Sequence, residues 1–328
     1  MPWFDAHLDL AYLAQRGRDM HATTHDINAG RAQAGAHTPA GVTLADLASA
    51  GVAGALGTIF TEAVPPSATP LEPQQYRAGD WNAARNAGLW QLHWYTQNAS
   101  KLPPNLGILI ECADVVAGVD DLPLWHGQGV VALGLTWVGQ GRYAGGNATQ
   151  TGLTTEGLEL VRHIDALGIV HDASHLSDAS FWQLCNATTR AIIATHSNCR
   201  SLLGGGATGE NQRHLSDEQI REIARRDGVI GLNLFSAFLD PDKRHLGRAT
   251  IADCTRHIEH VCTITNSRRH VALGSDTDGG FPADRLPQGI NSPADWHKLT
   301  EALAANGWSD ADLEGFQSAN WARVLHLS

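Results

Sequence analysis

The sequence contains few cysteines for its length, only five among 328 residues. Their number is odd and no two form a Cys-x-x-Cys pair, which argues against a disulfide framework and against a zinc site built from thiolates. The five are Cys112, Cys185, Cys199, Cys254 and Cys262. We therefore expect reduced, mostly structural thiols.

Basic residues are also scarce, with 23 Lys and Arg against 34 Asp and Glu, which gives a net charge of −11. Affinity for a nucleic-acid backbone comes from Lys and Arg side chains that release counterions. An acidic chain without an extended basic surface is not expected to bind nucleic acid. The partner that we expect is a small molecule.

The sequence also lacks long apolar runs. No window approaches the roughly 18 to 20 consecutive apolar residues that a bilayer span needs. The first residues, Met1 to Asp5, lack the basic and then apolar regions of a secretion signal. From the sequence we expect no membrane contact and a cytoplasmic location.

Short apolar runs bounded by turn residues recur along the chain instead, with helix-prone segments between most of them. Continuous apolar runs are typical of strands that are buried on both faces of a parallel sheet. The eight candidates are Trp3–Asp9, Ala53–Phe60, Leu106–Glu111, Val130–Trp137, Ile169–Ala173, Ala191–His196, Val229–Phe235 and Val271–Asp276.

Two of the helices between these strands are well marked. The pattern predicts a helix over Thr155–Leu167 that ends at Gly168. Its expected core face is Leu158, Val161, Ile164 and Leu167. A second helix is predicted to begin after Ser216, where Gln219 can complete a capping box.

Alternating strands and helices imply a parallel sheet, and a count of eight favours a closed (β/α)8 TIM barrel of the α/β class. We expect one barrel domain over residues 1–328, with loop insertions. The proline-rich stretch from Val64 to Pro73 and the run from Gly204 to Gly206 are interpreted as loops, because the strand pattern continues across both.

Polar side chains that can bind metal stand at the carboxyl ends of five of these strands, where barrel enzymes place their active sites. They are His7 and Asp9, Glu111, His175, His196 and Asp276. Any one of them could be an ordinary buried polar residue. Five apolar strands that bring such costly groups into one space are better explained by bound cations.

Three imidazoles and two carboxylates suit zinc or a similar divalent ion, and their number suits two ions bridged by a carboxylate. Such ions activate water, which favours hydrolysis as the reaction. Asp276 is then a candidate general base, with a sixth metal ligand as the alternative interpretation. Asp172, near His175, could orient a ligand histidine or make a structural hydrogen bond.

These residues lie in segments that resemble the membrane (renal) dipeptidase family of the amidohydrolase superfamily. The similarity spans nearly the whole chain, in the order that the family shows. The segments are Asp5-Ala-His-Leu-Asp9, Gly152-Leu-Thr154, the stretch from Leu167 to Ser177, Ala194-Thr-His-Ser-Asn-Cys-Arg200, the stretch from Arg213 to Glu218, Gly228-Val-Ile-Gly231, Gly274-Ser-Asp-Thr-Asp-Gly279 and Asn320-Trp-Ala-Arg-Val324.

The resemblance implies a zinc-dependent dipeptidase that cleaves the amide bond of small L,L or L,D dipeptides with a metal-activated water. It implies two Zn²⁺ ions per chain, with His7 and Asp9 on one, His175 and His196 on the other, and Glu111 as the bridge. It also implies that Asp276 is the catalytic acid/base and that Arg213 binds the free carboxylate of the dipeptide. A homodimer is a further expectation from the resemblance.

The chain departs from the family at three positions that concern the substrate. Trp137 stands where animal dipeptidases have a histidine, Tyr12 where a tryptophan is frequent, and Phe235 where a tyrosine follows the seventh strand. A longer loop between His196 and Arg213 could move the arginine. We interpret these aromatic residues as part of the substrate pocket. The alternative is the same mechanism acting on another small amide, an N-acyl amino acid or a lactone.

Overall fold

Eight strands of the computed structural model lie where the apolar runs predict them. The structure describes residues 2–204, 211–243 and 247–326, so Gly205 and Gly206 of the predicted loop lie outside the described residues. The barrel strands are β1 (Trp3–Leu8), β2 (Val52–Ile59), β5 (Asn105–Ile110), β6 (Val130–Gly134), β7 (Val170–Asp172), β8 (Ile192–Ile193), β9 (Ile230–Leu232) and β10 (Val271–Leu273).

These strands run parallel around one barrel, which confirms the predicted (β/α)8 class. The strands from β1 to β8 form one sheet in chain order, and β9 pairs with β10. Ala194 N donates to Val229 O at 3.0 Å, which joins the β8 segment to β9. Asp276 N donates to His7 O at 3.2 Å, which joins the end of β10 to β1.

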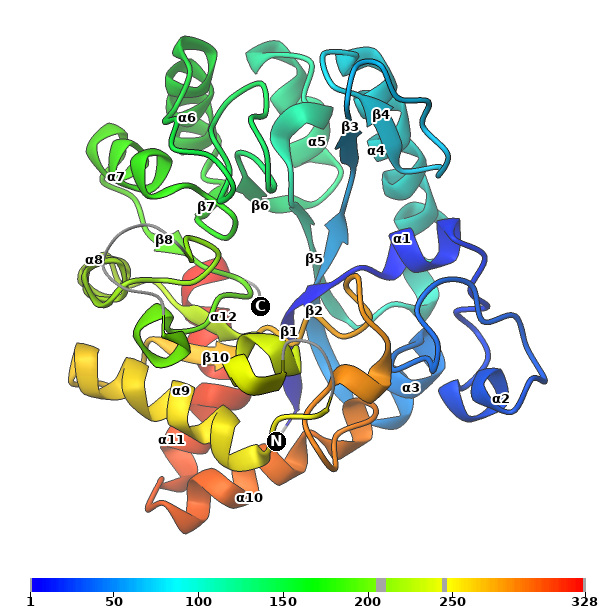
Figure 1. Cartoon of the computed structure of the whole chain (residues 1–328), viewed down its shortest axis with the longest axis vertical. Helices are drawn as coiled ribbons and strands as arrows, with labels where there is room; N and C mark the ends of the chain where they lie inside the picture. Colours follow the sequence, from blue (N-terminus) through cyan, green and yellow to red (C-terminus); the bar gives the residue numbers. More distant parts are fainter. Residues whose placement is uncertain (1, 205–210, 244–246, 327–328) are drawn as a thin grey trace.

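Helices surround the strands (Figure 1). They are α1 (Leu10–Gln15), α2 (Thr24–Asn28), α3 (Leu44–Ser49), α4 (Trp81–Gln97), α5 (Leu122–Gly127), α6 (Thr155–Leu167), α7 (Asp178–Ala187), α8 (Asp217–Arg225), α9 (Ile251–Thr265), α10 (His297–Ala305), α11 (Asp310–Glu314) and α12 (Asn320–Leu325). Two short strands, β3 (Glu62–Val64) and β4 (Gln75–Arg77), pair beside α4 and bracket most of the predicted proline-rich loop. Within the described ranges, no helix combines the length and the apolar character that crossing a bilayer requires.

The two helices that the sequence predicts most clearly, α6 and α8, both form, but one residue of the predicted core face of α6 is wrong. In α6 the Thr154 side chain caps the first turn and Gly168, at φ 73°, ends the helix. The buried face carries Leu160, whereas Leu158 is exposed, because the helical repeat places positions three and four apart on one face. In α8, Ser216 and Gln219 form the predicted capping box.

The predicted strands extend further than the observed ones at their carboxyl ends. The backbone leaves the ladder just before the polar residues, as β10 does three residues ahead of Asp276. His175 and Asp276 have φ values of 67° and 57°, a left-handed conformation that turns the chain out of a strand. Such backbone is concentrated at functional sites.

A register shift in β1 turns His7 and Asp9 toward the interior of the barrel. Phe4 and Ala6 belong to the cluster that fills the barrel, whereas Leu8 packs in the outer core against the helices. Strict alternation would turn Leu8 inward and His7 outward. The pairing of β1 with β2 is irregular between Asp5 and Leu8. This irregularity lets His7 face the interior together with Asp9.

A buried arginine fastens the loop after β10, which carries Asp276. Arg18 forms an ion pair with Asp278, and neither side chain is exposed. Arg18 also donates to the carbonyl oxygens of Ala36 and His37, both at 2.6 Å. The amides of Gly41 and Val42 donate to Asp278 at 2.8 and 3.0 Å. The network ties the segment after α2 to the loop that presents Asp276.

Arg18→Met is therefore expected to lower the free energy of unfolding by about 3–5 kcal/mol, because it leaves the Asp278 carboxylate buried without its partner. Urea denaturation of the purified variant measures the change. Arg31→Met is the matched control, since Arg31 pairs with Asp26 on the surface and both side chains are exposed. A loss no larger in Arg18→Met than in this control would contradict the structural role.

Candidate metal centre and substrate cavity

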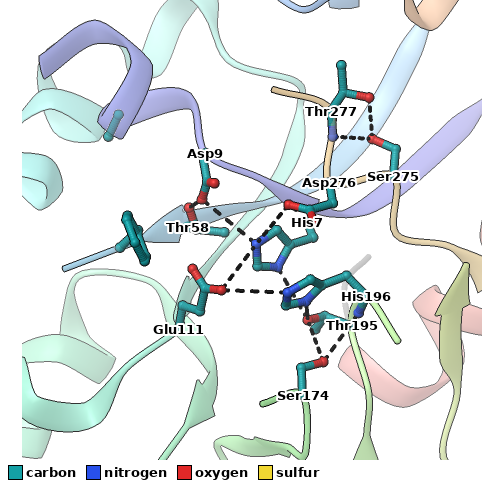
Figure 2. Close-up of polar contacts among 12 residues, drawn as sticks. His7, Asp9, Thr58, Glu111, Ser174, Thr195, His196, Ser275, Asp276 and Thr277 are labelled. Atoms are coloured by element: carbon teal, nitrogen blue, oxygen red, sulfur yellow. Dashed lines mark hydrogen bonds and ion pairs between the residues drawn. The ribbon is translucent and has the colours of Figure 1, made fainter. Parts of the chain in front are cut away.

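Six buried polar side chains meet at the carboxyl end of the barrel. The six are those that the sequence predicts: His7, Asp9, Glu111, His175, His196 and Asp276. Figure 2 shows five of them pointing toward one another, His7 and Asp9 from the end of β1 and the other three from the ends of three further strands. None is more than 7% exposed.

The Glu111 carboxylate lies among the three imidazoles. Its Oε1 atom is 3.8 Å from His7 Nε2, 3.1 Å from His175 Nε2 and 3.6 Å from His196 Nε2. His7 Nε2 is also 3.8 Å from Asp9 Oδ1 and 3.9 Å from Asp276 Oδ1. Ligand atoms of His7, Glu111 and His196, and those of His7, Asp9 and Asp276, form two groups whose members lie within 4.8 Å of one another.

Hydrogen bonds on the far side of the rings fix how two of these histidines are protonated. His175 Nδ1 lies 3.1 Å from Asn147 Oδ1, which can only accept. His196 Nδ1 lies 2.9 Å from Thr195 Oγ1, and that hydroxyl donates its proton to Asp172 Oδ2 at 2.7 Å. The hydroxyl must then accept from His196. Both Nδ1 atoms therefore carry the proton, and both Nε2 atoms are bare acceptors.

These bare acceptors face one another. His175 Nε2 and His196 Nε2 are 3.0 Å apart, and His7 Nε2 is buried without a hydrogen-bond partner. Acceptor atoms this close repel each other unless a cation lies between them. The donor set of imidazole nitrogens and carboxylate oxygens fits zinc or a similar divalent ion.

Burial also acts against charge on these groups when no cation is bound. Desolvation holds the pKa of His7, His175 and His196 well below the usual value for histidine. Desolvation, and then the charge of Asp9, hold the pKa of Glu111 and of Asp276 well above the usual values. The imidazoles are neutral, as metal ligands must be, and a cation would remove the cost of the clustered carboxylates.

Asp276 has one oriented oxygen and one free oxygen. Asn233 Nδ2 donates to Asp276 Oδ2 at 2.8 Å, while Oδ1 faces His7. A Cβ atom on Gly279 would collide with Asp276 Oδ1, so the glycine leaves room for the carboxylate. This geometry accommodates both interpretations of Asp276, proton carrier and sixth ligand.

A cavity of about 510 Å³ opens above these groups. All four residues that the sequence predicts to bind substrate line it: Tyr12, Trp137, Arg213 and Phe235. The guanidinium of Arg213 donates to Ser197 Oγ at 3.0 Å and to His196 O at 2.9 Å, which leaves other N–H groups for a ligand. The long loop before Arg213 has not moved the arginine away from the site.

Sequence reasoning missed the residues that orient the site. Thr195 and Asn233 lie within predicted strands and Asn147 in a loop, and nothing local marks the roles of Thr195 and Asn147. A usable signal was that Asn233 is a polar residue near the end of an apolar run, as the predicted ligands are. Asp172 does support a histidine, as considered from the sequence, but it acts on His196 through Thr195.

Comparison with known proteins places the chain among metallopeptidases. The family model described as membrane dipeptidase, peptidase family M19, matches residues 1–327. A Klebsiella pneumoniae protein, described as uncharacterized in the pqqA 5' region, is 33% identical over 62% of this chain and 74% of its own length. The Aspergillus oryzae dipeptidase aclJ is 28% identical over 62% of this chain but only 46% of its own length.

Solved structures of similar fold cover the whole chain. The structure of dipeptidase AC, a family M19 metallopeptidase, is 26% identical with a TM-score of 0.77, over 100% of this chain and 98% of its own. A Rhodobacter sphaeroides metallopeptidase, solved with a phosphinate mimic of L-Ala-D-Ala, is 24% identical with a TM-score of 0.78, over 100% and 99%.

Proposed function

The chain belongs to the membrane dipeptidase family, peptidase family M19, and from this premise we propose that it hydrolyses free dipeptides with two zinc ions bound per chain. The observation that carries the proposal is the convergence of three histidine Nε2 atoms on the Glu111 carboxylate, beneath a cavity that also holds Arg213. His7 and Asp9 would hold one ion, His175 and His196 would hold the other, and Glu111 would bind both.

When bound, zinc would lower the pKa of a water molecule toward about 7 and polarise the carbonyl under attack. The chain itself supplies binding and proton transfer. Burial lowers the pKa of Arg213, yet a guanidinium starts from so high a value that it stays charged. Arg213 would hold the dipeptide carboxylate with two parallel hydrogen bonds.

Asp276 would carry the proton. Its Oδ1 atom accepts a proton from the attacking water and delivers it to the amine nitrogen as the carbon–nitrogen bond breaks. Asn233 holds Oδ2 and so keeps Oδ1 turned toward the reaction. The products are two free amino acids.

The proposal is tested by incubating the zinc-loaded protein with L,L and L,D dipeptides, including L-Ala-D-Ala, and measuring amino acids released. Parallel incubations with N-acetylated amino acids and with a simple lactone address the alternative substrates. We expect chelator-sensitive cleavage of free dipeptides. Turnover of acylated amino acids or lactones without any turnover of free dipeptides would contradict the dipeptidase proposal and favour the same mechanism on these alternative substrates.

Three expectations from the sequence accompany this activity as proposals: a cytoplasmic location, no binding to membranes or nucleic acid, and a homodimer. The acidic composition supports the absence of nucleic-acid binding. Light scattering of the purified protein tests the homodimer, for which a molar mass near 35.1 kDa would be contradictory.

A further inference from the structure

The cavity above the candidate metal centre is lined to an unusual extent by aromatic rings. Four of the seven phenylalanines of the chain line it, together with one tyrosine and one tryptophan. The six are Tyr12, Phe60, Trp137, Phe235, Phe238 and Phe281. Four of these rings are only partly buried, so apolar surface stays open toward the cavity. Binding a ligand that covers such surface is favourable.

One group of rings, the first wall, consists of Tyr12, Phe60 and Trp137. Phe60 packs edge-on against Tyr12 at 5.5 Å and against Trp137 at 5.1 Å between ring centroids. Trp137 in turn lies 6.0 Å from the His175 ring. These residues follow β1, β2 and β6, so the first wall stands on that half of the barrel rim.

The other group, the second wall, consists of Phe235, Phe238 and Phe281. Phe235 stacks on Phe281 at 4.4 Å and meets Phe238 edge-on at 4.9 Å. These residues follow β9 and β10, the strands that complete the barrel after β8. In the circular strand order β10 is next to β1, so the second wall adjoins the first wall near Tyr12, whereas Trp137 follows β6, which β1, β2 and β5 separate from β10. The polar groups of the site line the same cavity as both walls.

Charged groups accompany each wall. The Arg213 guanidinium lies 5.3 Å from the Phe238 ring, beside the second wall. Among the described residues that line the cavity, Arg213 is the only Lys or Arg. Glu62 also lines the cavity and follows Phe60 of the first wall by two residues. The charges thus suit a carboxylate beside the second wall and an ammonium group beside the first.

We propose that the cavity selects dipeptides with a large apolar side chain on both residues. The first wall covers the amino-terminal side chain and the second wall covers the carboxyl-terminal one. This inference rests on the proposed dipeptidase function and adds its substrate class. A dipeptide of small residues would bind the same polar groups but leave both walls in water, and so would lose the free energy of covering them.

The test is a two-by-two series on the zinc-loaded enzyme: L-Ala-L-Ala, L-Phe-L-Ala, L-Ala-L-Phe and L-Phe-L-Phe, repeated with D residues at the second position. We expect kcat/KM to rise by about 10- to 100-fold for each phenylalanine. Equal or higher kcat/KM for L-Ala-L-Ala would overturn the inference while leaving the dipeptidase function intact.

Two matched variants test the assignment of the walls. Phe60→Ala is expected to remove the preference for phenylalanine at the first position only, and Phe235→Ala at the second position only. The opposite pattern, or equal effects of both variants on both positions, would overturn the assignment. Calorimetric titration of the same dipeptides into zinc-loaded Asp276→Asn gives affinities that do not depend on turnover. Binding of L-Ala-L-Ala as tight as that of L-Phe-L-Phe would contradict the inference even if no dipeptide is cleaved.

Discussion

Asp276→Asn is expected to lower kcat by a factor of about 10² to 10⁴, the range associated with general acid–base catalysis. An amide can keep the hydrogen-bonded geometry beside Asn233, but it cannot accept a proton from water or return one to the leaving amine. Zinc content should stay at the wild-type value, because all five predicted ligands remain. Steady-state kinetics and elemental analysis on the same preparation measure both quantities.

The control is Asp120→Asn, which removes an exposed carboxylate outside the cavity and should leave kcat unchanged. A variant at position 276 that keeps wild-type kcat would rule out Asp276 as the proton carrier. Loss of zinc together with loss of activity would favour the other interpretation of Asp276, a sixth ligand, which the position of its Oδ1 atom near His7 also accommodates.

Glu111→Gln should have a second large effect, on metal binding itself. Glu111 Oε1 lies within 3.8 Å of all three histidine Nε2 atoms, so among the described side chains it is the one best placed to join two cations. A neutral amide offers no charge to hold two dications together. Replacing a residue that only hydrogen-bonds to a metal ligand can lower metal affinity by a factor of about 100. We expect the loss of zinc affinity in Glu111→Gln to be larger than this.

Competition against a zinc indicator measures this affinity, and Glu159→Gln, an exposed position on α6, is the control. The metal-free Glu111→Gln protein should unfold at a temperature no lower than the metal-free wild type, because burial already disfavours the Glu111 carboxylate and raises its pKa. Wild-type zinc affinity in this variant would show that Glu111 is not a zinc ligand.

The barrel and its ligand set could be predicted because both depend on short stretches of sequence. Strands buried on both faces need continuous apolar runs, and these were visible at all eight positions. A polar residue that ends such a run must lie at the same rim as the others, since parallel strands share their carboxyl edge. The sequence alone therefore predicts that His7, Glu111 and His196 lie together, as they do.

Features that depend on contacts between distant segments were not visible in the sequence. The irregular pairing of β1 with β2 turns Leu8 outward, and nothing in the sequence of β1 marks it. Arg18 meets Asp278 from 260 positions away in the chain. Thr195 orients His196 only because Asp172 lies below it on the neighbouring strand. The predicted core face of α6 includes Leu158 because it follows a strict spacing of three residues. Such a spacing drifts around a helix of about 3.6 residues per turn, and Leu158 is in fact exposed.

The most direct test of the central claim is the zinc content of the purified protein, followed on the same sample by dipeptide hydrolysis before chelation, after chelation and after zinc is restored. The account predicts two zinc ions per chain, loss of dipeptide cleavage on chelation and its recovery with zinc. Dipeptide cleavage that persists in protein shown to hold no metal, or failure to bind any metal after reconstitution, would contradict it.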